Sequence, residues 1–294
     1  MGLDIHGLNL LRHARRHGAF QRCITIGRQG VHVDKMSLRT LLGAAPGYAP
    51  GTYCESLLQE HFGASSVDSI DNSNFESATI VHDMNQPIPA ALAAGYDTVF
   101  DGGCLEHIYN VTQALANCSA FCKPGAQILH VLPANNFCGH GFWQFSPELF
   151  FALYAPGNGY RDTEVFLADL EDTEHWYRVK MPENDQRVNV INAHELYLLV
   201  RTVVAGATVS HRAVQQSDYA YAWAQSAQAA APAGAVEPTA HPLKAALGPI
   251  ADGLRALKRR LRPYLRPYRR PPHSGLDGNN PGLTRVKVSA LLAG

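Results

Sequence analysis

The clearest alternation of apolar and polar segments lies between residues 96 and 133. Tyr96–Asp101 is long enough for one buried strand, and Gly102-Gly103 after it lets the chain turn. Apolar residues then recur at helical spacing: Val111, Ala114, Leu115, Cys118 and Cys122. Lys123-Pro124-Gly125 ends this helix, and Gln127–Leu132 is a second buried strand. The order strand–helix–strand predicts a right-handed parallel unit in an α/β sheet.

Similar patterns predict elements on both sides of this unit. We expect strands at Cys23–Ile26, Val67–Asp71 and Ala78–Val81. We expect helices within Leu3–Phe20, Ser37–Leu42 and Thr52–Phe62, and one beginning at Ser146-Pro147-Glu148. Thr52 is the expected N-cap of the third, with Glu55 three residues later. Three further strand candidates, whose register stays open, are Glu164–Leu170, Trp176–Val179 and His194–Ala205.

The segment after the strand at 96–101 carries a family resemblance. A strand ending in Asp101 is followed by Leu105-Glu106-His107, a helix, Lys-Pro-Gly and an apolar strand. In this order and spacing the features resemble strands four and five of class I S-adenosylmethionine-dependent methyltransferases, and the resemblance covers Cys23–Tyr154. It implies a Rossmann-like, mostly parallel α/β sheet with helices on both faces. It also implies an antiparallel edge made by the C-terminal strands, and S-adenosylmethionine as the cofactor.

The same resemblance implies which residues hold the cofactor. They follow strands one to four: Gly27, Gln29, Gly30, Asp71, Asp83, Asp101 and Gly102. Asp71 would accept the ribose hydroxyls and Asp83 the adenine amino group, although Asp71 also suits a simple Asx turn. The family places a glycine-rich loop after strand one, whereas Arg28 and Gln29 stand between two glycines here. This branch therefore either holds the cofactor differently or no longer binds it.

Pro133–Tyr154 follows the last parallel strand, and His140 lies there between two glycines. Because ligands in open α/β sheets sit at the carboxyl ends of strands, we expect His140, His107 and Glu106 to be catalytic. Either histidine would be the base, and Glu106 would orient one of them or contact the acceptor. We expect three nearby residues to bind the acceptor: Asn136, Trp143 and Gln144. The alternatives are that the aromatic rings only pack a helix, that His140 makes one backbone hydrogen bond, and that His107 is structural.

The histidines and the cysteine of this region could alternatively bind a metal ion. His107, His130, Cys138 and His140 show no recognised zinc spacing, so we expect no metal.

Composition narrows the class of protein. The 294 residues carry 25 basic and 25 acidic side chains, and the basic ones concentrate near the C-terminus, which leaves an acidic body. An acidic body argues against nucleic acid as a partner. The six cysteines form no Cys-x-x-Cys pair, the N-terminus does not resemble a signal peptide, and no apolar run reaches the roughly 18 residues of a membrane span. We expect a cytoplasmic chain with reduced thiols.

We expect four parts along the chain: an N-terminal helical extension (1–20), a methyltransferase-like domain (21–222), a linker rich in Ala, Gln and Pro (223–242), and a basic amphipathic helix with a disordered tail (243–294). The helical part, residues 243–265, suits peripheral contact with the inner face of a membrane or with a protein partner. A solvated tail is the alternative.

The expected function is S-adenosylmethionine-dependent methyl transfer to a small-molecule or glycan-type acceptor, as in polysaccharide or natural-product biosynthesis. A histidine would act as general base, because imidazole titrates near neutral pH. One alternative is a catalytically inactive methyltransferase fold that serves as a binding or scaffold protein. The other is cofactor-independent use of the same pocket.

Overall fold

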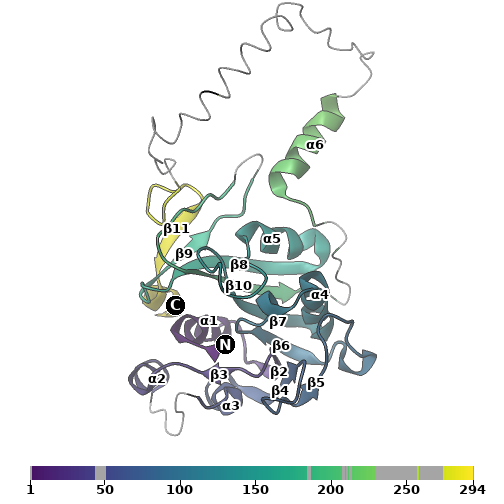
Figure 1. Ribbon diagram of the computed structural model, residues 1–294, viewed down its shortest axis with the longest axis vertical. Coiled ribbons are helices and arrows are strands. Elements are labelled where there is room, and N and C mark those ends of the chain that lie inside the picture. The colour runs from purple at the N-terminus through teal and green to yellow at the C-terminus, as the bar shows by residue number, and fades with distance from the viewer. Residues whose placement is uncertain are drawn as a thin grey trace, which may run out of the picture.

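The computed structural model (Figure 1) describes residues 2–43, 51–183, 187–206, 209, 211, 214–229, 257 and 274–293. Among these residues the main sheet has nine strands, in the order β11-β9-β8-β10-β7-β6-β2-β4-β5. A separate two-stranded parallel sheet joins β1 (Gly2–Leu3) to β3 (Gly30–Val31).

The parallel half of the main sheet contains five strands: β2 (Gln21–Ile26), β4 (Ala64–Asp71), β5 (Ile80–Val81), β6 (Tyr96–Asp101) and β7 (Cys122–Pro133). In chain order these are strands one to five, and their spatial order is the Rossmann order 3-2-1-4-5. β10 (Leu196–Val204) runs antiparallel between β7 and β8 (Tyr160–Asp169). This is the class I methyltransferase-like fold that the sequence predicts.

Helices cover both faces of the sheet (Figure 1). α4 (Val111–Phe121) and α5 (Pro147–Leu153) contribute to the core on one face, with Ile128 of β7. α1 (Ile5–Arg15), α3 (Glu55–Phe62) and α8 (Val288–Ala293) contribute to the core on the other, with Leu129 of the same strand. Successive side chains of a strand point to opposite faces, so the unbroken apolar run of β7 serves both cores.

Shorter elements complete the connections. α2 (Lys35–Leu42) follows β3, and single 3₁₀ turns lie at Ala90–Leu92, Leu105–His107 and Pro156–Asn158.

Most of the predicted elements are confirmed, but several differ in extent. Residues 122–125, expected to complete and end the helix, belong to β7 instead. β5 has only two residues, where Ala78–Val81 was expected. α3 begins at Glu55, and its N-cap is Cys54 rather than the expected Thr52. The backbone around Thr52 instead pairs with the loop after β2: Val31 donates its N–H to Thr52, and Cys54 donates to Gln29. Tertiary pairing thus replaces the expected capping box.

The expected disorder of the C-terminal tail is wrong for residues 274–293. β11 (Leu283–Lys287) pairs antiparallel with β9 (His175–Val179), which itself pairs with β8. The antiparallel end of the sheet is confirmed, but its edge is β11. Part of the expected linker is also helical, because α6 spans Ser217–Ala229.

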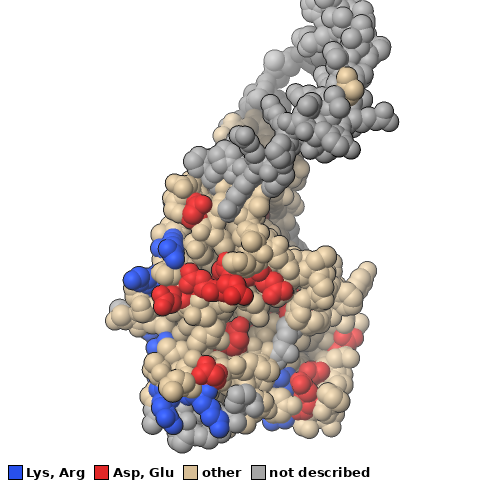
Figure 2. Space-filling model, turned by 60° about the vertical axis from the view of Figure 1, so that its left-hand side comes forward, with Lys and Arg blue, Asp and Glu red and all other residues tan. Residues whose placement is uncertain are grey.

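The predicted tail helix, residues 243–265, lies outside the described residues except for Leu257. No helix in the described part of the chain is long and apolar enough to cross a membrane. Figure 2 shows a band of acidic side chains across one face, with most of the blue side chains below it or to its left.

Candidate functional site

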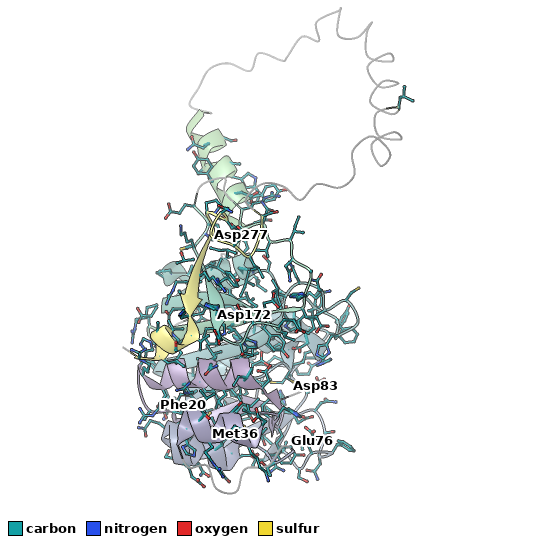
Figure 3. The ribbon with its side chains drawn as sticks, turned by 90° about the vertical axis from the view of Figure 1, so that its left-hand side faces the viewer. Phe20, Met36, Glu76, Asp83, Asp172 and Asp277 are labelled. Carbon is teal, nitrogen blue, oxygen red and sulfur yellow. The ribbon has the colours of Figure 1, made fainter. Side chains whose placement is uncertain are left out.

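The candidate site lies at the carboxyl edge of the parallel strands. β2 and β6 are neighbours there although they are the first and fourth strands in chain order, so their loops diverge and leave the crevice where open α/β sheets bind ligands. Figure 3 shows Glu76 and Asp83, which follow β4 and β5, on the side opposite Phe20, which precedes β2. The loops after β6 and β7 leave the same edge, so the predicted site residues have a common location.

Glu106, His107 and His140 come together at this edge. Glu106 Oε1 lies 3.5 Å from His140 Nε2 and 3.9 Å from His107 Nε2. The two imidazole rings meet edge to face with their centroids 5.1 Å apart. The Glu106 side chain is only 1% exposed, whereas those of His107 and His140 are 46% and 41% exposed. The three predicted catalytic side chains therefore form one cluster, with the carboxylate beneath two accessible rings.

Gly141 explains how His140 reaches Glu106. Gly141 adopts φ +74°, and a Cβ there would lie 2.7 Å from the Glu106 carbonyl oxygen. The same carbonyl accepts a 2.7 Å hydrogen bond from the Phe142 N–H, which ties the loop after β7 to the 3₁₀ turn after β6. A side chain would be strained at this positive φ, and the close approach to the Glu106 carbonyl leaves no room for a Cβ, so this position requires glycine.

The Glu106 carboxylate has neither a hydrogen-bond donor nor bulk water around it. Neither of its oxygens has a hydrogen-bond partner among the described residues. Burial, and after it the nearby Asp101 carboxylate, raise the pKa of Glu106 to about 8. Burial, followed by the neighbouring His140, lowers the pKa of His107. Such environments are typical of functional sites.

The loop after β2 departs from a glycine-rich loop for a structural reason. Arg28 donates to Glu55 Oε1 at 2.7 Å and to the Glu76 carbonyl at 2.8 Å, and its guanidinium lies 3.9 Å from the Tyr53 ring centroid. Arg28 thus ties the loop after β2 to α3 and to the loop after β4. The chain then enters β3 directly.

Gln29 fills the space between the glycines predicted to hold the cofactor. Its side chain is buried, and its Nε2 donates to the Ile26 carbonyl at 2.6 Å. A Cβ on Gly102 would lie 2.6 Å from Gln29 Oε1, and one on Gly27 would lie 3.4 Å from Gln29 Nε2. The Oε1 atom itself has no partner among the described residues. Gly27, Gln29 and Gly102 are therefore in contact, while Gly30 belongs to β3.

The three predicted aspartates differ in their surroundings. Asp71 is half-buried and caps its own turn, accepting the Ser73 N–H at 3.2 Å. Asp83 accepts the Asn85 N–H at 2.9 Å in a similar turn, which lowers its pKa. Asp101 is fully buried, and its two oxygens pair with the Cys104 N–H and with His130. Asp71 and Asp83 are thus accessible to a ligand, whereas Asp101 already has partners on both oxygens.

The three predicted acceptor-binding residues also differ in their surroundings. Asn136 has φ +68° and donates to carbonyls of the segment at residues 192–194. Gln144 Oε1 accepts the Phe137 N–H at 3.1 Å, so both side chains shape the loop. Trp143 donates to the Ile108 carbonyl at 3.0 Å and lines a pocket of about 650 Å³ that Asp83 also lines. Gln144 lines a separate pocket of about 460 Å³, whereas Asn136 lines neither of these two pockets.

Two groups at this edge were not predicted. Tyr109 and Phe142 are 76% and 68% exposed and meet edge to face, so they widen the apolar surface beside Trp143. Beneath the edge, His130 links Asp101 to the Tyr154 hydroxyl, at 3.0 Å and 2.8 Å. A histidine within an apolar strand signals such a buried network, but its partners come from β6 and α5 and cannot be read from spacing.

Comparison with known proteins adds the following. No family model and no curated protein matches the chain. Among solved structures it is similar to the N-methyltransferase NodS from Bradyrhizobium japonicum WM9 in complex with S-adenosyl-L-homocysteine, at 15% identity and TM-score 0.35, covering 67% of this chain and 84% of that one. It is also similar to a putative methyltransferase from Bacillus halodurans C-125, at 10% identity and TM-score 0.38, covering 67% and 99%.

A third similar structure is a methyltransferase from Thermotoga maritima described as a possible histamine N-methyltransferase. It shares 11% identity at TM-score 0.36, and the match covers 67% of this chain and 88% of that one. The strand order within the chain itself assigns the class I methyltransferase-like fold.

Proposed function

We propose that this chain is an S-adenosylmethionine-dependent methyltransferase that acts on a small-molecule or glycan-type acceptor. The observation that carries the proposal is the carboxyl edge of a sheet with class I strand order, where accessible or unpartnered acidic side chains follow strands two, three and four: Asp71, Asp83 and Glu106. Ligands of open α/β sheets bind at this edge.

The residues present fit the polar ends of the cofactor. A half-buried carboxylate such as Asp71 can accept both ribose hydroxyls, and Asp83 lines a pocket where it can accept the adenine amino group. Gln29 Oε1 is a buried acceptor without a partner between Gly27 and Gly102. It suits the ammonium group at the methionine end, in place of the backbone cradle of a glycine-rich loop.

The chain's own residues would then bind and prepare the acceptor. When bound, the cofactor supplies an electrophilic methyl group. The half-exposed rings of His107 and His140 carry nitrogens that can accept a proton from a hydroxyl or an amine. Tyr109, Phe142 and Trp143 offer an apolar surface beside the pocket that excludes water and suits a flat acceptor, such as a sugar ring.

Calorimetric titration with S-adenosylmethionine and S-adenosylhomocysteine tests cofactor binding. We expect saturable binding of both ligands, and a roughly 10- to 100-fold weaker affinity in Asp71→Ala, the cost of hydrogen bonds to a charged group. Asp277→Ala is the matched control: Asp277 also caps its own turn, accepting the Asn279 N–H at 3.0 Å, but it lies far from Asp83 and Glu76 (Figure 3). The control should bind both ligands like the wild type.

Failure of folded wild-type protein to bind either ligand would reject the proposal. A binding protein on an inactive methyltransferase fold, or cofactor-independent use of the pocket, would then remain. The side chains of Arg28 and Gln29 in the altered loop are the observation that favours these readings.

A further inference from the structure

Three atoms that can ligate a metal ion converge at the candidate site. Glu106, His107 and His140 offer one carboxylate oxygen and two ring nitrogens, all within 4.8 Å of one another. The two distances to Glu106 Oε1 are 3.5 Å and 3.9 Å. Ligands bound at about 2.0–2.2 Å in tetrahedral geometry lie roughly 3.3–3.6 Å apart. One of these two distances already lies in this range, and the other exceeds it by about 0.3 Å.

The buried carboxylate of Glu106 is an independent observation that points to a cation ligand. Both of its oxygens lack a hydrogen-bond partner among the described residues, and the side chain is 1% exposed. A buried carboxylate is costly unless a hydrogen-bond donor or a cation accompanies it. The Gly141 contact forces the loop onto Glu106 and so holds His140 at this carboxylate. The fold therefore holds a buried carboxylate, without a hydrogen-bond donor among the described residues, beside two histidine ring nitrogens.

We propose that Glu106, His107 and His140 bind one divalent transition-metal ion of the zinc type. Two imidazole nitrogens with one carboxylate suit zinc and ferrous iron, whereas calcium and magnesium prefer sites made of oxygen atoms alone. Three protein ligands leave at least one coordination position open for a water molecule or an acceptor hydroxyl, whose pKa the ion would lower. Metal binding itself does not depend on the proposed methyl transfer.

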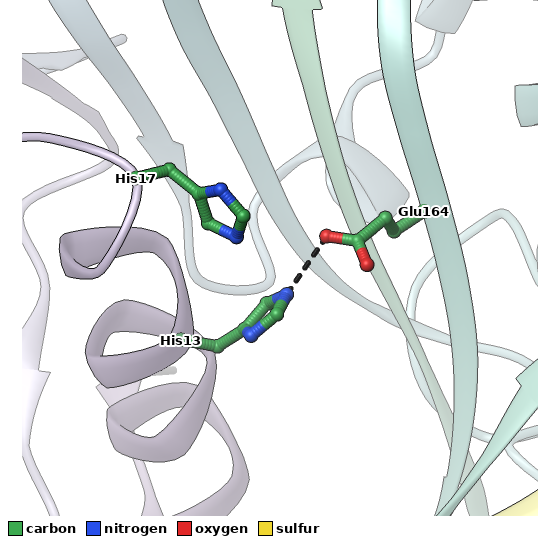
Figure 4. A group of neighbouring side chains, drawn as sticks. All are labelled: His13, His17 and Glu164. Carbon is green, nitrogen blue, oxygen red and sulfur yellow. Dashed lines mark hydrogen bonds and ion pairs between the residues drawn. The ribbon is translucent and has the colours of Figure 1, made fainter. Parts of the chain in front are cut away.

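A second group of two histidines and one glutamate also brings its ligand atoms together, but its carboxylate already has cationic partners. His13, His17 and Glu164 also place their ligand atoms within 4.8 Å of one another (Figure 4). There, however, Glu164 already pairs with His13 at 2.8 Å and with Arg178 at 2.7 Å, and Arg201 lies 3.5 Å away. Two guanidinium groups repel a cation and neutralise the carboxylate. This group is a natural internal control.

The test is a titration of full-length, untagged protein with zinc, after treatment with a chelator and in the absence of any cofactor. Calorimetry near neutral pH should give one zinc ion per chain. Cobalt should bind with the intense visible absorption of a four- or five-coordinate ion. We expect His140→Gln and Glu106→Gln to weaken zinc binding at least 100-fold, while His17→Gln in the control group binds like the wild type.

His107→Gln is the third variant. It keeps the proposal testable if the buried Glu106 position does not tolerate substitution, because the His107 side chain is 46% exposed. The absence of zinc and cobalt binding by folded wild-type protein would overturn the proposal. Binding that survives His140→Gln and His107→Gln would also overturn it, and so would a loss of binding in His17→Gln alone. Because no cofactor is present, failure here is distinct from failure of the cofactor titration.

Discussion

Glu164 on β8 is the centre of the best-defined ion network in the molecule. Its Oε2 pairs with His13 of α1, and its Oε1 accepts from Arg178 of β9. Arg201 of β10 lies 3.5 Å from Oε2, and its side chain is only 5% exposed. One carboxylate thus joins three elements, α1, β9 and β10, to β8. Burial acts to raise its pKa, but His13 and Arg178 outweigh burial and lower the pKa of Glu164 to about 2.

Glu164→Gln keeps the shape of the side chain but removes its charge. Removing one partner of a buried ion pair costs about 3–5 kcal/mol. Because the Glu164 side chain is 17% exposed, we expect the lower end, about 3 kcal/mol, measured by urea unfolding at pH 7. The matched control is Asp162→Asn, whose carboxylate is 56% exposed and pairs with the adjacent Arg161. There the loss should stay below about 1 kcal/mol.

The pH dependence separates charge from packing. The pKa of Glu164 is lower in the folded protein than its ordinary value of 4.5, so the unfolded chain binds more protons between pH 4.5 and 2. Wild-type stability should therefore fall as the pH drops through this range, by at most about 1.4 kcal/mol per pH unit and by less where solvent screens the charge. Glu164→Gln lacks this contribution, so the difference between the two proteins should shrink. An equal loss in both variants at pH 7, or a constant difference down to pH 2, would refute the role of this charge.

Three further predictions concern the loop after β7, the buried network and the C-terminal strand. Gly141→Ala should destabilise the fold by about 1–3 kcal/mol in chemical unfolding, because of its positive φ and the contact with Glu106. Gly139→Ala, where a Cβ meets nothing within 4 Å, should change stability by less than about 0.5 kcal/mol. Tyr154→Phe leaves a buried His130 nitrogen without its partner and should cost about 1–3 kcal/mol, whereas Tyr109→Phe, at an exposed ring, should be neutral. Truncation after residue 273 removes β11 and α8 and should lower the melting temperature, measured by circular dichroism; an unchanged melting temperature would contradict their packing role.

For the predicted site residues, sequence order gave the position in the sheet, whereas the side-chain contacts came only from the structure. Sequence order placed Asp71, Asp83, Glu106 and His140 after parallel strands, and such positions meet at one edge of any sheet of this kind. Their roles in binding and catalysis stay predictions. The sequence could not show that Gln29 packs against Gly102 or that His130 pairs with Asp101, because these contacts join segments far apart in the chain.

The sequence by itself determined the strand–helix–strand unit at 96–133, the parallel half of the sheet and the resemblance that these carry, because apolar periodicity, Pro, Gly and capping residues act over a few positions. Only the tertiary structure decided that residues 283–287 form the edge strand of the sheet, because this strand forms by pairing with β9, which lies far away in the sequence. It also decided that an adjacent glutamate and histidine converge with His140. That convergence depends on the backbone of Gly141 lying against Glu106, a long-range contact that no local pattern encodes.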